Sequence, residues 1–125
     1  MKSLICHKTV VSKNEFKNNT EVESIDVTDA YLVQSGGAFE NCINLKEVSF
    51  GRDITRIGHL SFNNCINLKD VWFLIIDENK IIEIAEDAFN GCEKQITFHI
   101  FGNAINNNHL NEYAKRHNFR VESMM

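Results

Sequence analysis

The chain has 125 residues, of which 43% are apolar and 24% are charged, and its formal net charge is −4. These values indicate one folded domain and exclude wholesale disorder, and no apolar run approaches the roughly 20 residues of a membrane-spanning helix. The acidic balance argues against a nucleic-acid binder that depends on overall positive charge. Three counts need an explanation: nine phenylalanines, four cysteines and no proline.

The N-terminal quarter begins with MKSLICHKTVV, whose apolar run stops at His7, so we expect no secretory signal within the chain. Residues 3–11 and 22–33 carry short apolar runs that are typical of strands. Because these residues do not match the repeat that follows them, we predict that residues 1–33 form a non-repeat cap.

A repeat occupies residues 34–102. The block Ala/Ser-Phe-x-x-Cys occurs three times, and the same intervals of 23 and then 27 residues separate its phenylalanines and its cysteines, which are Phe39, Phe62, Phe89, Cys42, Cys65 and Cys92. The additional residues of the longer interval lie in the segment LIIDENK, at 74–80. Repetition at such a period predicts a solenoid in which each unit is one coil.

Each unit contains a segment in which apolar and polar residues alternate, as in a half-buried strand, at 48–50, 71–73 and 98–100. The Phe-x-x-Cys block has the spacing of one short helical turn. The residue before each cysteine is Asn41, Asn64 or Gly91. Asn and Gly share a tolerance of positive φ, so we predict one tight backbone position that recurs in every coil.

The insertion at 74–80 places Leu74, Ile75 and Ile76 in one apolar run. A solvated loop does not favour so much apolar surface, so we expect the segment either to pair as an extended strand or to contact a partner. The partner could be a second copy of the chain. A homo-oligomer joined through residues 74–80 or through the solenoid ends therefore stays open.

Residues 103–125 have the pattern of a terminal cap, which a stack of repeats needs over its last apolar face. Apolar or aromatic residues recur at helical spacing at Leu110, Tyr113, Ala114 and His117. Asn107 or Asn108 is the expected N-cap. A last strand is expected at residues 119–121.

The units resemble the BspA-like leucine-rich repeats, in which L-K-x-V/I-x-F precedes an I-x-x-I-G strand and an A-F-x-x-C block. This chain supplies the three parts in order at residues 45–50, 54–58 and 61–65. The resemblance covers residues 38–121 and implies a short right-handed β/α solenoid of about three coils, of α/β class, within one domain over residues 1–125. Departures are Gly51 where the family usually has Pro, and Gln95 in place of Leu. Members of the family are largely cell-surface or secreted proteins with roles in adhesion and host contact.

The cysteines and histidines do not indicate an active site. Cys42, Cys65 and Cys92 share one repeat position, and their spacing matches no zinc pattern, so we interpret them as small buried residues without disulfides. The histidines show no metal-binding pair spacing, and none adjoins a plausible nucleophile, because Cys6-His7 alone is too little for a site; they are His7, His59, His99, His109 and His117. We expect no enzymatic activity, no metal and no cofactor.

The polar positions of the strands give the candidate binding face. If the apolar alternates face the core, the residues that face outward are Glu47, Ser49, Asp70, Trp72, Thr97 and His99. The single Trp is a suitable anchor, because Trp is enriched among binding hot spots. The alternative is that Trp72 packs under the insertion or an N-terminal segment.

The sequence therefore predicts a non-enzymatic protein-binding module, and the resemblance implies an adhesion or host-contact role. A second hypothesis is a small intracellular regulator or inhibitor that blocks an enzyme or a nucleic-acid complex. A third is a structural module that associates with itself. The protein partner is unidentified, and we expect neither membrane insertion nor nucleic-acid binding. By sequence alone the chain would be placed in the cytoplasm, which differs from the usual location of the family.

Overall fold

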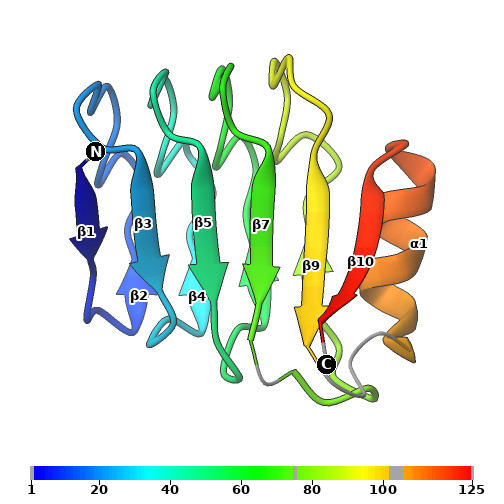
Figure 1. Ribbon diagram of the computed structural model, residues 1–125. Coiled ribbons are helices and arrows are strands. Elements are labelled where there is room, and N and C mark those ends of the chain that lie inside the picture. The colour runs from blue at the N-terminus through cyan, green and yellow to red at the C-terminus, as the bar shows by residue number, and fades with distance from the viewer. Residues whose placement is uncertain (1, 75, 102–105, 125) are drawn as a thin grey trace.

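The computed structural model describes residues 2–74, 76–101 and 106–124, which form a β-solenoid of stacked coils (Figure 1). Sheet A has six parallel strands, in the order β1 (Ser3–Ile5), β3 (Ser24–Val27), β5 (Glu47–Phe50), β7 (Asp70–Phe73), β9 (Thr97–Phe101) and β10 (Arg120–Met124). Sheet B has four parallel strands, in the order β2 (Val10–Val11), β4 (Leu32–Val33), β6 (Arg56–Ile57) and β8 (Glu83–Ile84). The core lies between the two sheets.

The strands are paired so that equivalent residues of successive units lie directly opposite each other. Val48 pairs with Val71, and Phe50 pairs with Phe73. All of these apolar side chains are buried, whereas the residues between them are half-buried on the outer face. A shift of one residue would turn every apolar side chain outward, so the buried face fixes the register.

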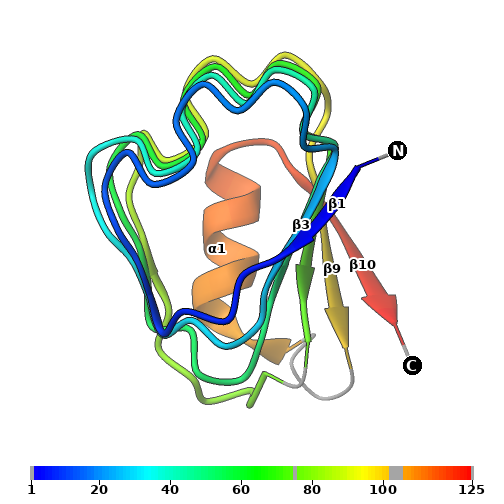
Figure 2. The same ribbon diagram turned by 90° about the vertical axis from the view of Figure 1, so that its left-hand side faces the viewer.

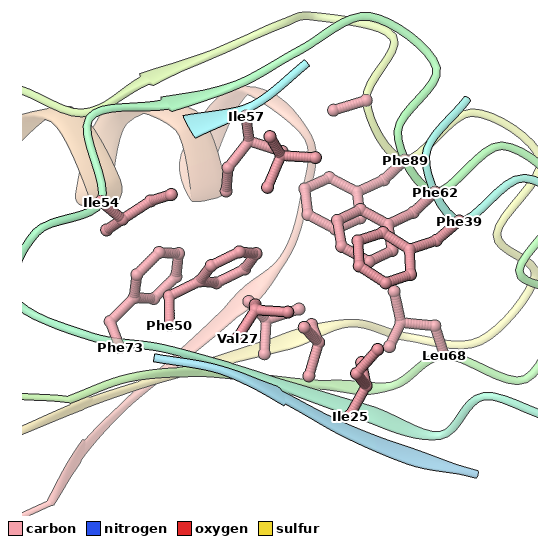
Figure 3. Close-up of a cluster of buried hydrophobic side chains, with 14 of the residues drawn as sticks. Ile25, Val27, Phe39, Phe50, Ile54, Ile57, Phe62, Leu68, Phe73 and Phe89 are labelled. Carbon is pink, nitrogen blue, oxygen red and sulfur yellow. The ribbon is translucent and has the colours of Figure 1, made fainter. Parts of the chain in front are cut away.

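Stacked phenylalanines fill the middle of the solenoid (Figure 3). The rings of Phe39 and Phe62 lie 4.8 Å apart and within 2° of parallel, and Phe89 continues the stack at 5.2 Å from Phe62. Full burial of one such side chain stabilises the fold by about 2–3 kcal/mol. The repeated phenylalanine position explains why this residue is so frequent in the chain.

The Phe-x-x-Cys blocks form hydrogen-bonded turns. The main-chain N–H of Cys42 bonds the carbonyl of Phe39, and that of Cys65 bonds Phe62. Within the described residues only one helix is present, at the C-terminal end, so the expected alternation of strand and helix is corrected to a solenoid of strands and turns. Two intervening residues close one turn but do not sustain a helix.

The predicted tight position before each cysteine is confirmed. The φ angles of Asn41 and Asn64 are both 62°, and that of Gly91 is 77°. The amide side chains also form a ladder between coils, because Asn64 Nδ2 donates to Asn41 Oδ1 at 3.2 Å. Asn18, at φ 65°, occupies the same position one coil earlier.

The segment at 1–33 was predicted to cap the repeats, and its strands continue both sheets. β1 and β3 pair in sheet A, and β2 and β4 pair in sheet B. Phe16 stacks on Phe39 at 5.3 Å, so the column of rings extends into this segment. The first described coil therefore uses the same packing positions as the coils that follow it.

The opposite end is closed by α1 (Asn108–Arg116), which lies across the last coil when the solenoid is viewed along its axis (Figure 2). The predicted helix is confirmed: Leu110, Tyr113 and Ala114 are buried, and Asn107 is the N-cap. The predicted last strand is β10, which adds to sheet A beside β9.

The insertion packs partly into the protein itself. Ile76 is buried, and a turn follows in which Lys80 N–H bonds the carbonyl of Asp77. Asn107 Nδ2 donates to the carbonyls of both Asp77 and Lys80, at 3.1 and 2.7 Å. Ile75 lies outside the described residues. The apolar surface of Ile76, which contributed to the expectation of a partner at 74–80, is therefore used within the chain.

Candidate functional site

The outer face of sheet A is turned towards the viewer in Figure 1, and no drawn segment crosses in front of its strands. The period-2 alternation that buries the apolar residues places two rows of side chains on this face. One row runs across β3, β5, β7, β9 and β10 and consists of Ser24, Glu47, Asp70, Thr97 and Arg120. The other row consists of Asp26, Ser49, Trp72, His99 and Glu122.

Trp72 lies near the centre of this face and is half-buried. Its indole stacks on the imidazole of His99, with ring centroids 3.9 Å apart and an interplanar angle of 15°. Phe101, also on β9, lies 6.3 Å away. Among the described residues, the rings next to Trp72 both belong to β9, and none comes from the insertion or the N-terminal segment, which were the alternative places for it to pack.

His99 links three strands. Its Nε2 lies 2.7 Å from Asp70 Oδ1 on β7, and its Nδ1 lies 3.3 Å from Glu122 Oε2 on β10. The second contact lacks hydrogen-bonding geometry, so Nδ1 is buried without a hydrogen-bond partner, as is Trp72 Nε1. Only 10% of the His99 side chain is exposed. The imidazole therefore packs against Trp72 and is shielded from solvent.

The predicted site residues divide into two groups. Glu47, Ser49, Asp70 and Trp72 are half-buried on the outer face, where a partner can reach them. Thr97 and His99 occupy the same face but are only 9% and 8% exposed. The half-buried side chains of the first group are accessible to a partner, and the buried side chains of the second group support them.

Two acidic residues of the same row, Asp26 and Glu122, were missed in the sequence. Asp26 pairs with Ser49, and Glu122 pairs with His99. Each lies 23 residues from its partner, so the repeat interval itself could have found both. They were missed because the repeat was traced from its phenylalanines and cysteines, and both of these residues lie in the assigned caps.

The cysteine column is a packing feature with a hydrogen bond at each step. The thiols of Cys42, Cys65 and Cys92 donate to main-chain carbonyls of the preceding coil at 3.1, 3.1 and 3.3 Å. The hydrogen bond with Cys42 and then burial raise the pKa of the Cys65 thiol, and burial raises the pKa of Cys92 to about 12. Cys65 and Cys92 are therefore thiols at neutral pH, which does not suit a nucleophile.

Two hollows lie beside β8, with volumes of about 230 and 210 Å³. Both are smaller than the roughly 300–1,000 Å³ of usual small-ligand pockets. The first contains Ser35 and His59, but the Ser35 hydroxyl accepts a hydrogen bond from the main-chain N–H of His59, while the His59 ring contacts Asp87. This arrangement does not present an activated serine.

Over the described ranges, no cluster of three or more His, Cys, Asp or Glu side chains is arranged to hold a metal ion. No helix in those ranges is long and apolar enough to cross a membrane.

A family model matches most of the chain. The BspA type leucine rich repeat region matches residues 7–122 in six copies. The match therefore includes most of the segment that the sequence analysis assigned to the N-terminal cap, and it counts more copies than the three coils expected there. No curated protein and no solved structure matches the chain.

Proposed function

Because the chain belongs to the BspA-type leucine-rich-repeat family, we propose that it is a non-enzymatic protein-binding module whose contact surface is the outer face of sheet A. Repeats of this family are commonly protein-binding. The regular backbone below this face holds its side chains in fixed rows, which favours binding without a large ordering cost.

The single observation that carries the proposal is the half-buried Trp72, held by the His99 stack at 3.9 Å on a face that no described segment crosses in Figure 1. An aromatic side chain that is already fixed loses little entropy when a partner covers it, and Trp is frequent among hot spots. Glu47, Ser49 and Asp70 border it and supply a polar rim.

The setting that we propose is adhesion or host contact, as in other members of the family. An adhesion or host-contact role predicts that the partner is a surface or extracellular protein. A cytosolic enzyme or nucleic-acid complex as partner would instead favour the intracellular regulator, and a concentration-dependent increase in mass by light scattering would favour self-association.

The test is capture of partners by the immobilised protein from extracts of the source cell and of its surroundings, compared between Trp72→Ala and Tyr31→Ala. Tyr31 is 46% exposed and immediately precedes β4 of sheet B, so its variant removes an exposed aromatic ring from the opposite side. We expect Trp72→Ala to lose the captured protein and Tyr31→Ala to retain it, with both variants folded by circular dichroism. Retention of every partner by Trp72→Ala would overturn the proposed surface.

A further inference from the structure

The indole of Trp72 has one closed face and one open face. His99 covers the side towards β9, where the two rings lie within 15° of parallel. The opposite side is turned towards β5, where the residue in register with Trp72 is Ser49. The side chain of serine is short, so it leaves space next to the indole that a larger side chain would fill. In the described part of the chain, the rings recorded beside Trp72 both come from β9.

Carboxylates surround this open face. Glu47 lies directly opposite Asp70, and Asp26 lies directly opposite Ser49. Adjacent strands are about 4.8 Å apart, and like charges in register across two strands repel each other. Asp70 is bonded to His99, and Asp26 accepts a hydrogen bond from Thr28 N–H. Repulsion between Glu47 and Asp70 would be relieved by a cation placed between them.

The chain does not supply that cation within its described residues. No outward position of β3, β5 or β7 is basic, and Arg120 lies two strands beyond Asp70, on β10. Lys46 immediately precedes β5 and pairs with Glu23 at 3.0 Å, and this hydrogen bond lowers the pKa of the Glu23 carboxyl. Lys69 immediately precedes β7 and is exposed, and it makes no ion pair with Glu47 or Asp70 in the described residues. Among the described residues, Glu47 makes no ion pair.

The Trp72–His99 stack also contains polar atoms that the chain leaves unsatisfied. His99, whose side chain is nine-tenths buried, has no hydrogen-bond partner at Nδ1, and Trp72 has none at Nε1. Buried polar atoms are usually paired, so these two atoms distinguish the Trp72–His99 pair from the rest of the outer face. A guanidinium only donates hydrogen bonds, so arginine on the open face of the indole would leave the Trp72 N–H as it is.

We propose that the space bounded by Trp72, Ser49 and Glu47 receives an arginine side chain of the protein partner. A guanidinium is planar, so it can lie flat on the open face of the indole while its N–H groups donate to the Glu47 carboxylate. A lysine ammonium is a point charge and cannot do both with the same geometry. This inference rests on the proposed binding role of sheet A and specifies the chemistry of what binds there.

The test uses three synthetic nonapeptides in a Gly-Ser background, which carry three arginines, three lysines or three citrullines. Citrulline has nearly the shape of arginine without the charge. Trp72 is the only tryptophan in the chain, so its fluorescence reports binding at this place. We expect the arginine peptide to bind about fivefold more tightly than the lysine peptide, and the citrulline peptide to give no saturable change.

Two variants and one control variant locate the binding site of the arginine peptide. Glu47→Gln should weaken binding of the arginine peptide about fivefold, whereas Glu78→Gln should leave it unchanged, because Glu78 lies exposed in the insertion and loses the same charge. Ser49→Leu fills the space and should abolish the fluorescence response. Equal weakening by both Glu variants, equal affinity for arginine and lysine, or normal binding to Ser49→Leu would each overturn the inference.

The two proposals fail separately. If Trp72→Ala loses a captured protein partner and the arginine peptide does not bind, the surface is correct and the arginine site is wrong. If Trp72→Ala retains every partner while the peptide binds as expected, the arginine site stands and the partner surface is wrong.

Discussion

Individual residues in this solenoid act across coils and not within them. Each thiol of the cysteine column donates to a carbonyl of the preceding coil, such as Cys65 to Phe39 at 3.1 Å. The sequence predicted the column from its repeat intervals, because equal spacing places equal residues in one line. It could not identify the acceptor, since a carbonyl 26 residues away carries no signature in the side-chain pattern.

For the binding face, too, the sequence pattern predicts the position of a residue but not its contacts. Alternation predicted that His99 lies on the outer side of its strand, which is where the structure has it. Its burial at 8% exposure depends on the neighbouring Trp72 ring, and ring orientation does not follow from strand period. The sequence therefore predicted the face and its row of residues, but not which of them a partner can contact.

The cysteine column predicts how stability depends on pH. Burial raises the pKa of Cys92 from an ordinary value of about 9 to about 12. The unfolded chain then loses this proton first as pH rises, so the contribution is intact below about pH 9 and is lost from pH 9 towards pH 12. The loss can reach about 1.4 kcal/mol per pH unit for one group.

Urea unfolding at pH 7 and pH 10, with a reducing agent present, measures this effect. Cys92→Ser cannot ionise in this range, so its deficit relative to the wild type should be about 1 kcal/mol smaller at pH 10 than at pH 7. The measurement at pH 7 is the internal control for the effect of the substitution on packing. Parallel loss of stability by both proteins between the two pH values would contradict the prediction.

At the scale of elements, the strands of the repeats and the terminal helix could be predicted because their patterns are periodic. The first coil could not, although Phe16 and Asn18 lie 23 residues before Phe39 and Asn41. Asn19 occupies the position of the cysteine there, so this coil lacks the residue that identifies the block most specifically. The blocks were also expected to be helical, but i to i+3 turns share the short-range apolar spacing of a helix and differ from it only in length.

Asn107 joins two elements and is fully buried. Its Oδ1 caps α1 by accepting from Leu110 N–H at 3.2 Å, and its Nδ2 bonds the two carbonyls of the insertion turn. Asn107→Ala loses the cap and the hydrogen bond to the Lys80 carbonyl, whereas the Asp77 carbonyl keeps the Lys80 N–H, so the variant should lower the free energy of unfolding by about 2–3 kcal/mol.

Asn107→Asp keeps the helix cap, but it places a carboxylate in a fully buried position against the carbonyl oxygens of Asp77 and Lys80, to which it cannot donate. We therefore expect the Asp variant to be at least as unstable as the Ala variant. The midpoint and slope of urea unfolding check both variants. Wild-type stability of Asn107→Asp would show that only the cap contributes.

For the whole molecule, a stack of coils is held together by contacts between neighbours, so its ends and its middle differ in stability. Matched amides report this difference, because one main-chain hydrogen bond recurs between successive coils at nearly constant length. Glu23 N–H bonds Lys2 at 2.9 Å, and Lys69 N–H bonds Lys46 at 3.1 Å.

In a sample of this 125-residue chain, opening its first coil breaks one interface between coils, whereas opening a middle coil breaks two. The C-terminal end has α1 over its core, but the described residues include no helix at the N-terminal end. Under conditions in which exchange reports equilibrium opening, the Glu23 amide should therefore exchange at least about tenfold faster than the Lys69 amide, a difference of about 1.4 kcal/mol in opening free energy. Hydrogen exchange followed by NMR measures both amides in one sample, and equal rates would mean that the solenoid opens only as one cooperative unit.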